Sequence, residues 1–347
     1  MPKFYDITEW NEKPWFQTGG TRSKVIVENP STGDDYYFKS SLKKEKIDYK
    51  YEFWSEIIAS KVGTLLGFDM LRYDIAYNRG EIGCLSKSMV TEGKNKLTEG
   101  ISYLTGYNTN YNPKDKSSKK LYTFDFIRKT LEHFQFSHYI RNIIEIIILD
   151  SIIGNGDRHQ ENWGIITDYK EVIKTFKDIP KSKFKSSLRK ILKLIFVKFK
   201  VERVEKEQFN KEINLKMLGK FSPIYDSGSS LGREFDDGKV KQMLTDNLMI
   251  EAYIRKGVSE IHWEGNKLNH IDLIEKIKLL YPDIVRDIIS KVEKKYSKEK
   301  IEKCVFDIDK KLPSELEQFK LPKYRKEFII KLITLRVENL LNIKTEQ

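Results

Sequence analysis

Two short motifs constrain this chain more than any other feature. Residues 154–164 read GNGDRHQENWG, and residues 223–228, further along the chain, read PIYDSG. The first motif places Asp157 in a glycine-flanked loop with Asn162 five residues later, and the second places Asp226 at the start of another loop. Phosphoryl transfer from a nucleotide uses one Asp that accepts or orients the proton of the attacking hydroxyl, and an Asn and a second Asp that hold magnesium. The two motifs therefore predict a phosphotransferase site.

The same residues carry a family resemblance. The runs GNGDRHQENWG and PIYDSGSSL resemble the catalytic and metal-binding loops of HipA-like serine/threonine kinases, especially the short CtkA-type members. The DRHxxN pattern is also similar to that of phosphatidylinositol kinases. The resemblance implies an α+β, bilobal, protein-kinase-like fold, with a small β-rich N-lobe and a larger, mostly helical C-lobe. It also implies ATP and Mg²⁺ as cofactors, Ser and Thr of protein substrates as acceptors, and autophosphorylation.

Each polar residue of the motifs has an expected role. Asp157 is the candidate base, and His159 is a second candidate catalytic residue, as a donor to a phosphate. Asn162 and Asp226 are the expected magnesium ligands, because magnesium takes hard oxygen donors and keeps much of its water. The alternatives are a loop Asp that accepts local backbone hydrogen bonds, a turn Asn and a His that structures the loop. The presence of both motifs in order favours the catalytic interpretation.

The residues that pair with the nucleotide are expected in the first third of the chain. Lys39 ends a predicted strand, where a kinase places the lysine that pairs the α- and β-phosphates. Its acidic partner should lie on the following helix, where Glu52 and Glu56 share a face. The HipA-like pattern favours Glu56. By its order in the chain, the segment that contacts adenine should lie near residues 86–90.

A glycine-rich stretch precedes the first predicted strand. Gly19, Gly20 and Lys24 belong to the run GGTRSK, which looks like the GGxxxK stretch of HipA-like proteins. Glycines let backbone N–H groups approach phosphates closely, so this run is the candidate phosphate-covering loop. Family members often carry a phosphorylatable Ser a few residues earlier, where this chain has Gln17 and Thr18.

The hydrophobic pattern of the first third predicts strands around one helix. Strands are expected at 23–28 and 35–39, a helix at 49–66, and two further strands at 74–77 and 82–86. This order is that of a kinase N-lobe.

The whole chain is expected to divide into three parts. Residues 1–104 form the nucleotide-covering N-lobe, residues 105–120 form a polar, turn-rich loop between lobes, and residues 121–347 form the helical C-lobe. Helices are expected at 124–136 and 137–153 within the C-lobe. The two motifs and a basic insertion at 168–220 lie in the same lobe, with short strands at 163–166 and 222–225.

The positive charge of the chain is concentrated in that insertion. The formal net charge is +12, and residues 168–220 contain 16 Lys and Arg against 7 Asp and Glu. This distribution fits a basic insertion on a near-neutral enzyme better than a nucleic-acid binder, so we expect an acidic partner surface and no direct nucleic-acid binding. Residues 186–199 read as a basic amphipathic helix that packs on the lobe, with binding to anionic membranes or nucleic acid as the alternative.

Several features bear on location. The longest apolar run, residues 143–153, contains two carboxylates and is too short to span a bilayer, so a buried helix is expected. The N-terminus lacks a basic-then-apolar signal pattern, and two cysteines are too few for a disulfide framework. We expect a cytoplasmic protein, with secretion of an effector that lacks a recognisable signal as the alternative.

Three other functions remain open. A lipid or small-molecule kinase would fit the likeness to phosphatidylinositol kinases and the basic insertion. A nucleotide-binding regulator of the toxin–antitoxin type, with an antitoxin-like partner, would fit the HipA resemblance. A metallophosphoesterase would need more metal-binding histidines than the pattern offers, because the chain has five His and neither His262 nor His270 lies in such a motif.

Overall fold

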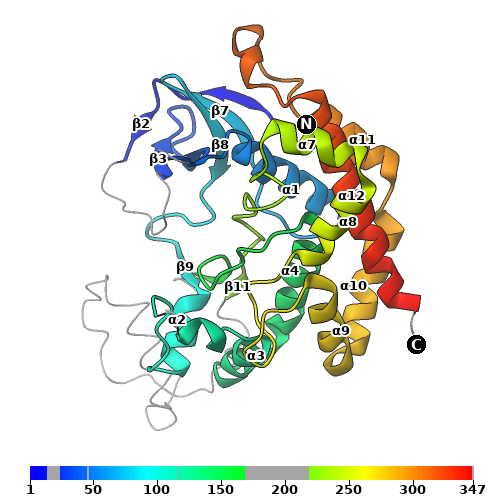
Figure 1. The fold of residues 1–347 in the computed structure, drawn as a ribbon. Coiled ribbons are helices and arrows are strands. Elements are labelled where there is room, and N and C mark those ends of the chain that lie inside the picture. Colours follow the sequence, from blue (N-terminus) through cyan, green and yellow to red (C-terminus); the bar gives the residue numbers. More distant parts are fainter. Residues whose placement is uncertain (14–23, 45–46, 116, 169–218, 346–347) are drawn as a thin grey trace, which may run out of the picture.

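The computed structural model describes residues 1–13, 24–44, 47–115, 117–168 and 219–345. These residues form two lobes of α+β structure, a β-rich lobe with one long helix and a larger lobe that is mostly helical (Figure 1). The fold class expected from the sequence is therefore confirmed. Nearly all of the basic insertion, including its expected helix, lies outside the described residues.

A six-stranded sheet builds the smaller lobe. Its strands lie in the order β1 (Phe4–Asp6), β7 (Asp74–Asn78), β8 (Glu81–Lys87), β4 (Asp35–Ser40), β3 (Lys24–Glu28) and β2 (Asn11–Glu12). The four strands expected from the hydrophobic pattern are its four central ones. The outer strands β1 and β2 were not expected, since two or three residues are too few to show a strand pattern. A separate two-stranded ribbon joins β5 (Lys43–Lys44) to β6 (Ile47–Asp48).

One helix, α1 (Glu52–Leu66), packs behind the sheet and confirms the helix expected between the two strand pairs. It ends at Gly67, whose φ of 93° is the left-handed conformation that glycine adopts most easily after a helix. Most of its side chains are buried, including the carboxylates of Glu52 and Glu56, each about 1% exposed. A buried carboxylate requires a charged or hydrogen-bonding partner, so this helix already points to a polar site inside the molecule.

A second sheet lies in the larger lobe. It contains β9 (Asn95–Glu99), β10 (Gly164–Asp168) and β11 (Lys220–Phe221), with β10 in the centre and antiparallel to both neighbours. The strand expected at 163–166 is thus confirmed as β10. The expectation of a strand at 222–225 is wrong, because β11 ends at Phe221. Of those four residues, Ile224 forms an isolated bridge with Met70 of the smaller lobe. That bridge ties the second motif to the lobe opposite.

The passage between the lobes lies at residues 88–94, between β8 of one sheet and β9 of the other. The sequence predicted it at residues 105–120. Those residues instead begin with the end of α2 (Gly100–Tyr107), which packs against α3, and close with the 3-10 helix η1 (Ser118–Leu121). Their turn-rich composition marks a surface segment within the larger lobe, which composition alone does not distinguish from a connection between lobes.

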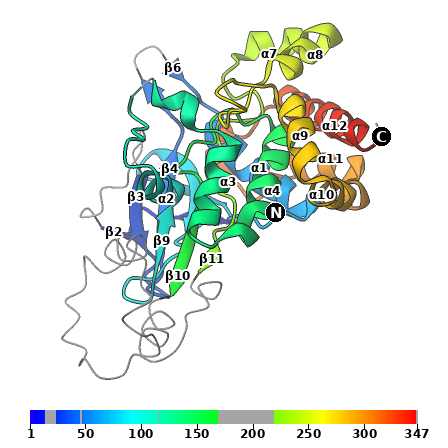
Figure 2. The same cartoon turned by 90° about the horizontal axis from the view of Figure 1, so that it is seen from below.

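Helices make up the rest of the larger lobe. They are α3 (Phe124–His133), η2 (Ser137–Tyr139), α4 (Ile140–Ile153), α7 (Asp237–Thr245), α8 (Asn247–Lys256), α9 (His270–Leu280), α10 (Pro282–Lys295), α11 (Lys298–Phe306), η5 (Ser314–Phe319) and α12 (Lys323–Thr345). Figures 1 and 2 show α9 to α12 on the side of α4 that faces away from β9 and β11. The apolar side chains of this run in α4 are all buried, as expected, and belong to one core cluster that extends to α1. Burying each Ile or Leu contributes about 1.5–3 kcal/mol, so α4 is a rigid base for the loop that follows it.

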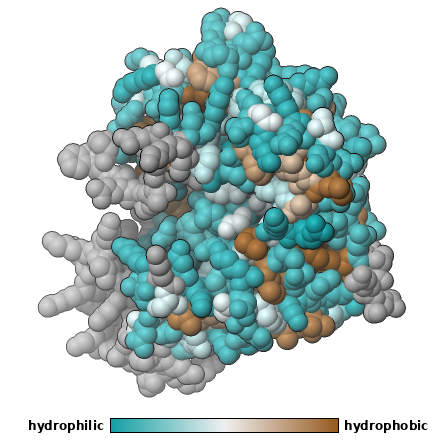
Figure 3. Space-filling view, viewed as in Figure 1, coloured by the Kyte–Doolittle hydropathy of each residue, from teal (hydrophilic) through white to brown (hydrophobic). Residues whose placement is uncertain are grey.

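The face of the molecule shown in Figure 3 is mostly polar. Figure 3 shows one face covered largely by hydrophilic side chains, with hydrophobic ones gathered in small groups. Among the residues that the structure describes, no helix is both long enough and apolar enough to cross a membrane.

Candidate active site

A cavity of about 530 Å³ lies between the two sheets. This volume is in the range of pockets that hold small molecules and cofactors. Its walls come from β3, β4, β8, β9, the passage between the lobes and the second motif. The lining residues are Lys24, Ile26, Tyr37, Lys39, Leu71, Tyr73, Ser86, Ser88, Met89, Val90, Asn95, Lys96, Leu97, Glu99, Tyr225 and Asp226. The segment expected near an adenine therefore lies at the cavity.

Strand register decides which side chains face this cavity. Successive side chains of a strand point to opposite faces of a sheet. Ile26 pairs with Tyr37, which pairs with Ser86 on the other side, and all three line the cavity. Lys39 lies two residues after Tyr37 and shares its face, whereas Phe38 between them packs into the outer cluster of the sheet. The alternation of β4 thus turns the Lys39 side chain toward the cavity.

Lys39 is held by two carboxylates. Its Nζ lies 3.2 Å from Oε2 of Glu56 on α1 and 2.5 Å from Oδ1 of Asp226 in the second motif. Lys39 is 8% exposed and Glu56 1% exposed, so the ion pair is shielded from solvent. The structure brings together these three residues, which are separated by up to 187 positions in the sequence. Glu52, the alternative partner, pairs with Arg233 at 2.7 Å.

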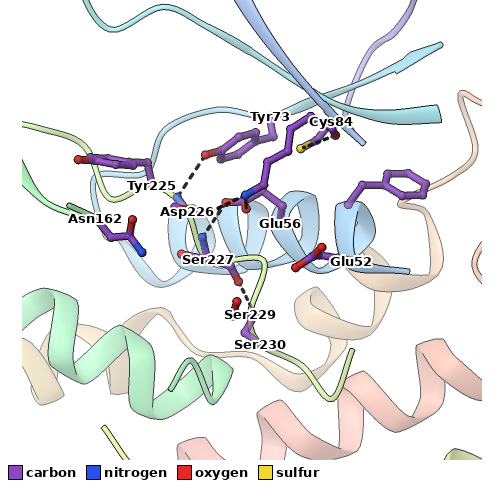
Figure 4. A network of polar contacts seen from close by, with 12 residues as sticks. Glu52, Glu56, Tyr73, Cys84, Asn162, Tyr225, Asp226, Ser227, Ser229 and Ser230 are labelled. Atoms are coloured by element: carbon purple, nitrogen blue, oxygen red, sulfur yellow. Dashed lines mark hydrogen bonds and ion pairs between the residues drawn. The ribbon is translucent and has the colours of Figure 1, made fainter. Parts of the chain in front are cut away.

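Both carboxylate oxygens of Glu56 are used. Oε1 accepts a hydrogen bond of 2.7 Å from the backbone N–H of Ser227, while Oε2 faces Lys39. The neighbouring Gly228 has to be glycine for this approach, because a Cβ there would lie 2.8 Å from Oε2. Glu56 thereby joins α1, β4 and the loop after Asp226 (Figure 4).

Asp226 has an unusual backbone. Its φ of 53° is left-handed, which non-glycine residues seldom adopt, and its N–H donates to the hydroxyl of Tyr73 at 3.3 Å. Burial raises the pKa of Tyr73 well above its ordinary value, so the hydroxyl stays protonated. Strained residues of this kind persist where the surroundings fix them, often at functional sites. Here the strain turns the carboxylate toward the cavity and Lys39.

The first motif begins where α4 ends. Gly154 takes the left-handed conformation at φ 71°, and its N–H and that of Asn155 both donate to the carbonyl of Asp150. A side chain at Gly154 would meet the guanidinium of Arg336 at 2.5 Å. The glycine therefore both ends the helix and lets α12 pack against the loop.

Arg158 connects the two motifs, a role that their spacing does not predict. Its guanidinium forms two bonds to the buried Asp150 carboxylate, at 2.8 and 3.0 Å. It also donates to the carbonyls of Asn162 and Tyr225 and to Oγ of Ser227. Burial works against its charge, but Asp150 outweighs burial and raises the pKa of Arg158 above its ordinary value. The sequence contained one hint of this pair. Asp150 lies inside the apolar run, where a buried carboxylate needs a partner, and Arg158 of the DRH motif is the nearby cation that could supply it.

The remaining motif residues lie around this Arg158 connection. Asp157 is exposed, whereas Asn162 is 4% exposed and donates from Nδ2 to the carbonyl of Asp157 at 3.0 Å. That bond engages the amide nitrogen and leaves the amide oxygen as the atom suited to a cation. His159 is half-buried, and its Nδ1 lies 3.7 Å from Glu161. The contacts of the His159 ring are thus within its own loop.

Lys24 lines the cavity, while Gly19 and Gly20 lie outside the described residues. The donor set fits magnesium, since Asp226 and Asn162 offer hard oxygen atoms and Mg²⁺ needs only one or two protein ligands beside phosphate and water. Within the described ranges, no group of three or more His, Cys, Asp or Glu could hold a metal.

Comparison with known proteins supports the fold. No protein-family model matches the sequence, and no curated protein does. The crystal structure of the Helicobacter pylori proinflammatory kinase CtkA is similar with a TM-score of 0.71 and 17% identity, over 99% of this chain and 96% of that chain. A Shewanella oneidensis MR-1 complex of the toxin–antitoxin system HipA, HipB and operator DNA contains a chain that is similar with a TM-score of 0.50 and 10% identity, over 96% of this chain and 66% of that chain. The chain therefore has the fold of the HipA-like kinases, as its motifs led us to expect.

Proposed function

We propose that this chain, which has the fold of the HipA-like kinases, is an ATP- and Mg²⁺-dependent kinase that phosphorylates Ser or Thr of protein substrates. One observation carries the proposal. Lys39 lies at the cavity between Glu56 and Asp226, which is the arrangement a kinase uses to pair its lysine with nucleotide phosphates. The carboxylates on either side form ion pairs with Nζ of Lys39 at the wall of the cavity.

The chemistry divides between two loops. Asn162 and Asp226 would hold magnesium, and bound Mg²⁺·ATP would supply the phosphoryl group. Asp157 orients the acceptor hydroxyl and accepts its proton. Arg158 is a positioning residue, because its bonds to Asp150, Ser227 and two carbonyls hold both loops in one geometry. Positioning and charge neutralisation supply most of the rate of phosphoryl transfer.

A lipid or small-molecule kinase is the runner-up within enzymes. It uses the same groups on the nucleotide and differs only in the acceptor. An antitoxin-type protein partner is a further proposal, supported by the likeness to a chain of the complex that contains HipA and HipB. Direct binding of nucleic acid by this chain is not proposed.

The test begins with binding. Saturating ATP and Mg²⁺ should raise the melting temperature of the purified chain, because a ligand at one hundred times its Kd stabilises the folded state by about 2.7 kcal/mol. Labelled ATP is then supplied with casein, with a histone mixture, or with vesicles that contain phosphatidylinositol. Label in protein supports the proposal, and label only in lipid supports the runner-up. Absence of any melting shift in folded protein would rule out both.

A further inference from the structure

We propose that Ser229 is a phosphoryl acceptor within its own molecule, an inference that rests on the kinase function proposed above. Ser229 lies three residues after Asp226, on the loop that Figure 4 shows below Ser227. Its hydroxyl donates a hydrogen bond of 3.1 Å to Oδ2 of Asp157. An acceptor hydroxyl must make this contact with the base of a kinase, at about 2.6–3.2 Å.

The neighbouring serines make different contacts. Ser230 donates to the carbonyl of Ser227 at 2.6 Å, and Ser227 Oγ accepts from Arg158 at 3.1 Å. Both side chains are buried, whereas Ser229 is only half-buried and Asp157 is exposed. Of these three loop serines, the one whose hydroxyl reaches the base also has the most exposed side chain.

The loop also contains a cation that suits the product. Arg233 donates from Nη2 to Ser229 Oγ at 3.0 Å, and its Nη1 is held by Glu52 at 2.7 Å. Its guanidinium lies over the ring of Tyr49, 4.2 Å from the centroid. A phosphate on Ser229 would carry a charge of about −1.5 to −2 and three acceptor oxygens. A fixed Arg beside it forms charge-assisted hydrogen bonds with such a group.

The transfer balances without a further reactant. A bond forms between Ser229 Oγ and the γ-phosphorus of ATP, and the bond from that phosphorus to the β–γ bridging oxygen breaks. ADP leaves, and the Ser229 proton passes to the Asp157 carboxylate. Asp157 then releases that proton to solvent, and its carboxylate repels the product phosphate while Arg233 attracts it. The modified side chain therefore leaves the base, which becomes open to an acceptor from another molecule.

The experiment uses the full chain, first dephosphorylated, with Mg²⁺ and radiolabelled ATP. Peptide mass spectrometry should locate phosphate on Ser229, and the first-order rate constant should stay the same over a tenfold range of protein concentration. The Ser229→Ala variant should incorporate at least tenfold less label than the unmodified sequence. Ser31→Ala, at an exposed turn of the other lobe, should keep it. The melting temperature of each variant checks that it is folded.

The outcomes separate this inference from the proposed function. Transfer to casein or histone without phosphate on Ser229 would overturn the inference and leave the kinase standing. A rate constant that rises in proportion to protein concentration would show transfer between molecules and would also overturn it. If the folded chain neither binds nor turns over Mg²⁺·ATP, both fail together.

Discussion

The two halves of the candidate site differ in how they are built. The nucleotide half consists of Lys39, Glu56 and Asp226, of which the first two are nearly inaccessible to solvent. The acceptor half consists of Asp157 and Ser229, and their hydrogen bond lies at the surface. Ion pairs in a low-dielectric interior are strong and sensitive to the loss of a partner, whereas exposed contacts exchange readily with water. The comparison teaches that burial fixes the geometry of the half proposed to bind the nucleotide, whereas the hydrogen bond of the half proposed to hold the acceptor can exchange with water.

Substituting Arg158 tests whether this residue holds the two halves of the site in one geometry. Arg158→Ala would leave the buried Asp150 carboxylate without its ion-pair partner, which should cost about 3–5 kcal/mol of folding free energy. It should also loosen both loops and reduce transfer. The matched control is Arg128→Ala, which breaks a partly exposed pair on α3 with Asp125 and Glu132 and should cost less than about 1 kcal/mol. Equal melting temperatures for the two variants would show that Arg158 does not join the halves.

Lys39 tests the nucleotide half alone. Lys39→Met keeps most of the side-chain volume but removes the charge that faces Glu56 and Asp226, so transfer should fall by about 10²–10³-fold. The control is Lys87, which lies on β8 of the same sheet and forms an exposed ion pair with Asp34. Lys87→Met should change transfer less than twofold. Assays at a temperature where both variants are folded separate lost chemistry from lost stability. A Lys39 variant with the activity of the Lys87 variant would remove Lys39 from the site.

Deleting the basic insertion should change the activity of either half less than the substitutions above. Strands β10 and β11 are antiparallel neighbours, with Ile166 opposite Lys220, so the chain leaves and returns at the same end of the sheet. Replacing residues 169–218 by a short Asn-Gly turn should therefore leave ATP-dependent stabilisation unchanged. We expect it to reduce phosphorylation of an acidic substrate such as casein, and the reduction should vanish at high salt because exposed charges are screened within about 8 Å at physiological ionic strength. A chain that unfolds on deletion would show that the apolar residues of 186–199 belong to the core.

The same division explains what the sequence could predict. Asp157, Asn162 and Asp226 lie in short motifs, and Lys39 and Glu56 follow from a strand and a helix with clear periodicity. The pattern and the order of elements were enough to expect Lys39 and an acid on the following helix, but the choice of Glu56 over Glu52 came from the resemblance to HipA-like proteins.

Other features needed the tertiary structure. The roles of Arg158 and Arg233 depend on partners that packing supplies, Asp150 and Glu52 respectively. The passage between the lobes was misplaced because β9 is set by its pairing with β10 and not by its own composition.

The most direct test compares one substitution in each half, Asp157→Asn and Asp226→Asn. Both should lower phosphoryl transfer, the first by about 10²–10⁴-fold because it removes the base. The measurement that decides is the rise in melting temperature on adding ATP with Mg²⁺, relative to ATP without it. We predict that Asp157→Asn keeps the full magnesium-dependent rise and that Asp226→Asn loses most of it. The same rise in both variants, or its loss in both, would contradict the division of the site into a nucleotide half and an acceptor half.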